Sequence, residues 1–159
     1  MCLRKRLMGQ LATVSAGSNT MPWTARLIGD HTQCELELVR LEQLAAEVNR
    51  VRSFCDRRLH WDAEDLQRVA QAIAAKVAYL LEPLGPVELD PDAATLLMRS
   101  VAPSHDEPTR RAYYELLVRS GELTLRRYEV DSGRPRRTVP MVLSVEVLAR
   151  LVADLDSVV

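Results

Sequence analysis

The sequence predicts an α+β fold in which an N-terminal helical hairpin precedes a roughly four-stranded antiparallel sheet that is closed by a C-terminal helix. Apolar residues recur at spacings of three and four through residues 33–60 and again through residues 62–82, which is typical of amphipathic helices. Residues 112–130 alternate around a Ser-Gly turn as two strands do. Residues 145–155 return to helical spacing after a serine cap.

The bulk composition is that of an ordinary globular protein. The chain has 159 residues, of which 47% are hydrophobic and 27% charged, and this balance argues against disorder. A formal net charge of −1 excludes a uniformly basic protein that coats nucleic acid. Charge is nevertheless uneven: residues 109–138 carry eight arginines against four acids, whereas residues 82–107 carry six acids against one arginine.

The sequence divides into three segments. Residues 1–30 are expected to be a flexible basic arm or the product of a start upstream of the native one, with Met21 as the alternative start. Residues 31–83 form the helical hairpin, and residues 84–159 form the sheet and the C-terminal helix. Polar residues interrupt the apolar stretch that a secretory leader needs, and no run is long enough to span a membrane. We therefore expect a cytoplasmic protein without a membrane partner.

The cysteines predict reduced thiols. Cys2, Cys34 and Cys55 are odd in number and show no paired spacing. On one continuous helix, Cys34 and Cys55 would lie about 31 Å apart, beyond the reach of a disulfide. Free thiols on a helix fit a cytosolic compartment.

No pattern in the chain predicts catalysis, a metal or a cofactor. The histidines are scattered, without the spacing of metal ligands, and no glycine-rich phosphate loop is present. Ser104-His105-Asp106 contains the residue types of a hydrolase triad, but consecutive residues cannot align nucleophile, base and orienting acid. We expect a protein that is not an enzyme.

The first predicted helix, residues 33–60, carries a heptad-like seam at Leu41, Leu44, Val48 and Val51. This seam predicts a homodimer through the helix, and packing of the same stripe against the rest of the chain is the competing interpretation. The second predicted helix begins at the N-cap Asp62 and ends before Pro83.

The turn at Ser120-Gly121 sets the register of the predicted hairpin. One face pairs apolar residues, among them Val118 with Leu123, and the other pairs Tyr113 with Tyr128 and Glu115 with Arg126. An alternative stays open, in which residues 108–119 form a helix and residues 122–142 form the wing of a winged-helix DNA reader.

The face with tyrosine and arginine is the strongest functional candidate. A single strand of nucleic acid needs cations for its phosphates and flat rings on which its bases stack. The expected binding residues are Tyr113, Arg119, Arg126, Tyr128, Arg134, Arg136 and Arg137. If Glu115 neutralises Arg126, the free charge is concentrated at the turn, in Arg134, Arg136 and Arg137. The competing interpretation is a solvated sheet face with cross-strand Arg–Glu pairs.

The end of the chain resembles a known family. The strand RRYEV, a basic turn, the strand VPMVLS and the helix VEVLARLVADL are similar to the ending of Pur-type and Whirly-like single-stranded-DNA-binding regulators. Over residues 112–156 the resemblance implies a four-stranded antiparallel sheet before a helix, dimerisation, and strand binding by basic and aromatic residues of the sheet. The expected function is a non-enzymatic module that binds single-stranded nucleic acid. The alternative is an assembly module that dimerises through residues 33–60.

Overall fold

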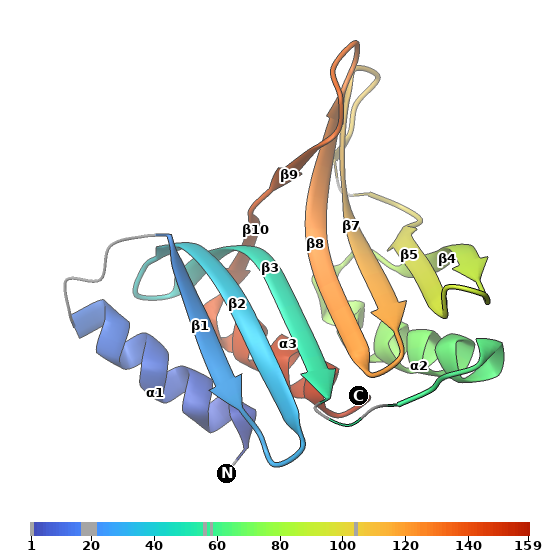
Figure 1. The fold of residues 1–159 in the computed structure, drawn as a ribbon. Helices are drawn as coiled ribbons and strands as arrows, with labels where there is room; N and C mark the ends of the chain where they lie inside the picture. The colour runs from blue at the N-terminus through green and yellow to red at the C-terminus, as the bar shows by residue number, and fades with distance from the viewer. Residues whose placement is uncertain (1, 17–21, 56, 58, 104) are drawn as a thin grey trace.

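The computed structural model describes residues 2–16, 22–55, 57, 59–103 and 105–159, and shows an α+β protein with a large antiparallel sheet (Figure 1). Met21, the alternative start, lies outside the described residues. In chain order the elements are α1 (Leu3–Ala16), β1 (Trp23–Ile28), β2 (Thr32–Leu41), β3 (Ala45–Cys55), α2 (Ala63–Lys76), the 3-10 helix η1 (Val77–Leu80), β4 (Leu84–Asp90), β5 (Thr95–Ser100), β6 (His105–Asp106), β7 (Arg110–Arg119), β8 (Glu122–Asp131), β9 (Arg137–Val139), β10 (Met141–Ser144) and α3 (Val145–Asp156).

The strands of the sheet follow the order β1-β2-β3-β8-β7-β5-β4, with β6 added to β7, β9 to β8 and β10 to β3. Strands β3 and β8 pair only where residues 51–54 meet residues 122–125, and beyond this stretch they part. We call the point at which they part the fork. The segment of β9 and β10 enters the fork, because β9 pairs with β8 and β10 pairs with β3. Pro140, which cannot donate a ladder hydrogen bond, lies between the two short strands.

Three helices cover one face of the sheet. Helix α1 packs on β1 and α3, α2 packs on β4, β5 and β7, and α3 packs on β2 and β3. Helix α2 therefore covers strands that follow it in the chain, whereas α3 returns from the C-terminus to cover the first strands (Figure 1). Because the three helices together cover the strands β1–β3 and the strands β4, β5 and β7, both groups of strands contribute to one apolar core.

The predicted helical hairpin and the roughly four-stranded sheet are wrong. Residues 32–55 form β2 and β3, and the sheet has ten strands among the described residues. The side chains of Cys34, Leu36 and Leu38 are buried and alternate with polar neighbours, as in a strand that covers a core with one face.

A β-bulge explains the false heptad. Glu37 pairs with Arg50 and Leu38 pairs with Val48, so that Asn49 is an extra residue on β3. Val48 and Val51 consequently both face the core although they are three residues apart. The irregularity produces a spacing that a helix would also produce, and the spacing therefore predicts a helix where the chain forms a strand.

The four residues of the predicted dimer seam do not form one surface. Val48 and Val51 are completely buried in the core, and Leu41 packs against the core from its edge. Leu44 is 78% exposed in the turn between β2 and β3. With no helix over residues 33–55, the predicted route to a dimer has no structural basis.

Residues 3–16, which the sequence places in a flexible arm, form helix α1. Its residues Leu3, Leu7 and Leu11 are buried in the core. The Gln10 side-chain amide donates to the carbonyl oxygen of Arg26 at 3.2 Å, and Arg6 donates to a second carbonyl oxygen of β1. Polar side chains of α1 thus occupy backbone groups of an edge strand that would otherwise be open to pairing.

The second predicted helix and the C-terminal helix are confirmed. Asp62 caps α2 in a capping box, accepting from the backbone N–H of Asp65 at 2.9 Å. Ser144 caps α3 by accepting from the N–H of Val147 at 3.1 Å.

The β7–β8 hairpin is confirmed together with its register. Tyr113 lies opposite Tyr128 and Glu115 opposite Arg126, as the Ser-Gly turn predicts. Gly121 has a φ of 70°, a left-handed conformation that favours glycine. Because residues 110–119 are extended, the winged-helix alternative is wrong.

The buried thiol of Cys34 leads to a testable difference in reactivity. Cys34 lies in β2 and not on a helix, and burial raises its pKa to about 12. Since the thiolate is the reactive form, we expect a maleimide at pH 8 to label the exposed Cys2 and the half-buried Cys55 in the native protein, and Cys34 only after unfolding. Mass spectrometry of labelled peptides measures this, with guanidinium-treated protein as the control. Equal native labelling of Cys34 and Cys2 would contradict the structure.

Candidate nucleic-acid interface

The face of the sheet that no helix covers carries five of the seven predicted binding residues, namely Tyr113, Arg119, Arg126, Tyr128 and Arg136. We use the name arginine face for the central part of this uncovered face. It is formed by β3, β8, β7 and the end of β5, and the segment that follows β8 crosses it. Strand pairing places side chains from these elements side by side on it. It is made by Arg50, Arg52, Arg99, Tyr113, Glu115, Arg119, Glu122, Arg126, Tyr128 and Arg136.

The two tyrosines of the arginine face stack on each other. The ring centroids of Tyr113 and Tyr128 lie 6.2 Å apart with an interplanar angle of 28°. The guanidinium carbon of Arg99 lies 5.5 Å from the Tyr113 centroid, and that of Arg136 lies 4.2 Å from the Tyr128 centroid. Both rings are therefore already covered by cations. A flat ligand would therefore meet the guanidinium planes of Arg99 and Arg136 instead of the tyrosine rings, and bases stack on guanidinium planes as they do on aromatic rings.

Glu115 pairs with arginines other than the predicted one. Its carboxylate accepts from Arg99 Nε at 2.9 Å and from Arg136 Nη1 at 2.8 Å. The pKa of the Arg136 guanidinium is raised first by its hydrogen bond with Tyr113 and then by Glu115. The expected neutralisation of Arg126 by Glu115 is wrong, because two other arginines occupy the carboxylate.

The arginines near the β8–β9 turn are ion-paired. Arg137 Nε donates to Glu129 at 3.0 Å, and Arg110 Nε donates to the same carboxylate at 2.8 Å. These two hydrogen bonds, with that of Arg137 the stronger cause, lower the pKa of Glu129. Arg134 lies 3.9 Å from the carboxylate of Asp131. Arg134, Arg136 and Arg137 therefore each have an acidic partner and are not free cations as expected, although Arg110 and Arg137 share the single charge of Glu129.

Unpaired positive charge is found at the fork instead. Arg126 is half-buried and, like Arg119, forms no ion pair with any other described residue. Across the fork, Arg50 pairs with Glu37 at 2.7 Å, while its Nε is buried without a hydrogen-bond partner. Arg52 donates to Glu122 at 2.8 Å, and this hydrogen bond lowers the pKa of Glu122.

These side chains surround a cavity of about 280 Å³, which we call the fork cavity. Four arginines and two glutamates contribute to its lining. Arg50 and Arg52 also pair with Glu37 and Glu35, which do not line the cavity, so the lining cations without an ion pair among the described residues are Arg119 and Arg126. The lining residues are Arg50, Arg52, Glu115, Leu117, Arg119, Glu122, Thr124, Arg126 and Tyr128. The expected site residues Arg119, Arg126 and Tyr128 thus come together here, whereas Arg134 and Arg137 do not.

Arg50 and Arg52 are site residues that the sequence did not reveal. The apolar spacing of residues 33–60 places them in a helix, which does not predict their approach to Arg126. The signal that could have found them is the alternation of Gln33 to Leu38, which indicates a strand and hence a partner strand after the next turn.

No family model matches the chain, and no curated protein or solved structure is significantly similar to it. In the part of the chain that the structure describes, no helix has the length and apolar character needed to cross a membrane. The same residues contain no group of three or more His, Cys, Asp or Glu side chains that could hold a metal ion. Ser104 of the triad-like tripeptide lies outside the described residues.

Proposed function

We propose that the protein is a non-enzymatic binding module that holds a single strand of nucleic acid across its arginine face, centred on the fork cavity. The observation that carries this proposal is the half-buried residue Arg126, which has no acidic partner among the described residues and lines the same cavity as Arg50 and Arg52. Like charges held together in a partly desolvated hollow repel each other, and a bound anion relieves that repulsion.

The shape of the site favours a single strand over a duplex. A cavity of about 280 Å³ has room for one phosphate or base, and the open sheet face lets a flexible strand follow the arginines. Guanidinium planes over Tyr128 and Tyr113 supply flat surfaces for bases. The resemblance of residues 112–156 to Pur-type and Whirly-like regulators implies the same ligand.

Fluorescence anisotropy with a labelled oligothymidylate of about 12 nucleotides tests the proposal. We expect binding at about 50 mM salt that weakens as salt rises, because phosphate contacts release counterions. Arg126→Gln is expected to weaken binding about five- to tenfold and to reduce the slope of log K against log salt by about 0.7, the share of one phosphate contact.

Arg68→Gln is the matched control. Arg68 lies on α2, on the helix-covered side of the sheet, and its side chain is 74% exposed. Its replacement by glutamine removes the same single positive charge as Arg126→Gln. We expect this variant to bind like the wild type. Absence of binding at about 50 mM salt, or an equal loss in both variants, would overturn the proposal. Thermal unfolding of each variant shows whether the fold is kept.

A further inference from the structure

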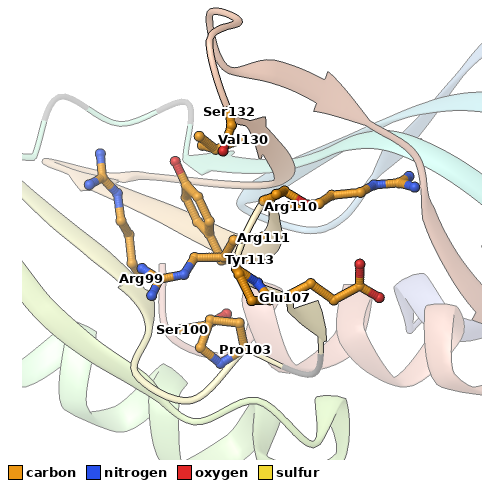
Figure 2. A pocket seen from close by; sticks show the side chains of 11 residues that line it. Arg99, Ser100, Pro103, Glu107, Arg110, Arg111, Tyr113, Val130 and Ser132 are labelled. Atoms are coloured by element: carbon orange, nitrogen blue, oxygen red, sulfur yellow. The ribbon is translucent and has the colours of Figure 1, made fainter.

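A second hollow lies on the other side of the tyrosine pair. It is an open cleft of about 560 Å³ between the loop that follows β5 and the end of the β7–β8 hairpin (Figure 2). Along β7, Arg111 lines this cleft and precedes Tyr113, whereas Glu115 and Arg119 line the fork cavity and follow it. The two hollows are therefore arranged in line along one strand, with the stacked rings between them.

The cleft has a cationic side. Figure 2 shows Arg99, Arg111 and Tyr113 extending toward one side of the cleft, and Arg110 and Glu107 extending toward the other. Arg99 is bonded to Glu115 through Nε, and its two Nη groups donate to no other described residue. Arg110 is held by Glu129. Arg99 is therefore the cation that is best placed to meet an anion entering the cleft.

The remaining walls of the cleft are partly apolar. Pro103, Pro108 and Val130 line it together with the ring of Tyr113. A cationic side next to apolar walls suits a ligand that combines an acidic group with a flat ring, and the volume lies within the range of about 300–1,000 Å³ that is common for small-ligand pockets. A nucleotide has both parts.

We propose that this cleft binds one nucleotide, with its phosphate at Arg99 and Arg111 and its base against the apolar wall. The inference rests on the proposed function, because the natural occupant would be one unit of the strand held at the fork cavity. Arg111 and Arg119 lie eight residues apart on β7, about 26 Å along the strand, a distance that on the order of four extended nucleotides would span.

The test is an NMR titration of the full chain with thymidine monophosphate, followed through the backbone amides. We expect shifts at residues 107–113 that thymidine, which lacks the phosphate, does not cause. Inorganic phosphate is expected to bind at least about tenfold more weakly, because it makes no contact with the apolar wall. Phosphate binding as tight as that of the nucleotide, or an absence of shifts at residues 107–113, would overturn the assignment.

One arginine inside the cleft and one outside it supply the matched variants. Arg111→Gln is expected to weaken thymidine monophosphate binding about fivefold or more, whereas Arg68→Gln, which loses the same charge on helix α2 outside the cleft, leaves binding within about twofold. An equal loss in both variants would count against the cleft. If the mononucleotide binds here but no oligonucleotide binds, the proposed function fails and the cleft stands. If oligonucleotides bind through Arg126 and are insensitive to Arg111→Gln, the function stands and the cleft inference fails.

Discussion

Replacing Val48 by aspartate is expected to prevent folding, whereas the same replacement at Leu44 leaves the protein folded. Val48 is completely buried in β3, where it pairs with Leu38 on one side and Met141 on the other. A carboxylate there would have no partner, at a cost of about 4–5 kcal/mol or more, which is comparable with the whole stability of a typical domain. Leu44 is 78% exposed in a turn, so a change within about 0.5 kcal/mol is expected.

This pair of variants separates the structure from the coiled-coil interpretation. In a helical seam, Leu44 and Val48 are equivalent interface positions, and either change would alter the oligomeric mass without unfolding the chain. In the sheet, the two positions differ in burial, because Val48 lies in the core and Leu44 is exposed. Circular dichroism with urea titration measures folding, and light scattering measures mass. Two folded variants with the same change of mass would contradict the fold.

Glu82→Ala is expected to destabilise the protein by about 3–5 kcal/mol, because it leaves a buried cation without its partner. The Glu82 carboxylate accepts from Arg127 Nη2 at 2.9 Å and from Ser100 Oγ at 2.7 Å. The side chains of Glu82 and Arg127 are only 2% and 12% exposed. Ser100 Oγ in turn accepts from the N–H of Tyr114 at 2.8 Å, and the Arg127 guanidinium covers the Tyr114 ring at 4.5 Å. One carboxylate thus links the end of η1 to β5, β7 and β8.

Urea unfolding of two further variants identifies the cause. Glu88→Ala removes an exposed acid of β4 and is expected to change stability by less than about 0.5 kcal/mol. Glu82→Leu combined with Arg127→Met replaces the pair by apolar groups and is expected to recover most of the loss, since neither charge is then left buried alone. A loss below about 1 kcal/mol for Glu82→Ala would show that the pair does not stabilise the fold.

Short sequence patterns were enough to predict the turns and helix starts, because their geometry depends only on residues that are neighbours in the chain. The Ser-Gly turn determined the register of β7 and β8, because a two-residue turn leaves one way to pair the strands that flank it. Asp62 and Ser144 determined where α2 and α3 begin, because an N-cap acts within one helical turn. The presence of Tyr113, Tyr128 and Arg126 on one face followed from the same register.

The tertiary structure decided what depends on distant segments. A bulge at Asn49, required by pairing with β2, made β3 resemble a helix in its apolar spacing. Arg136 reaches Glu115 only because the chain folds back after β8, and this contact is one of the two that leave Arg126 without its predicted partner. Arg50 comes from β3, more than seventy residues before Arg126 in the chain. By itself, the sequence determined which residues share a face of the β7–β8 hairpin. The choice of ion partners, and with it the location of free charge, required the folded chain, because Coulomb attraction depends on distance in space.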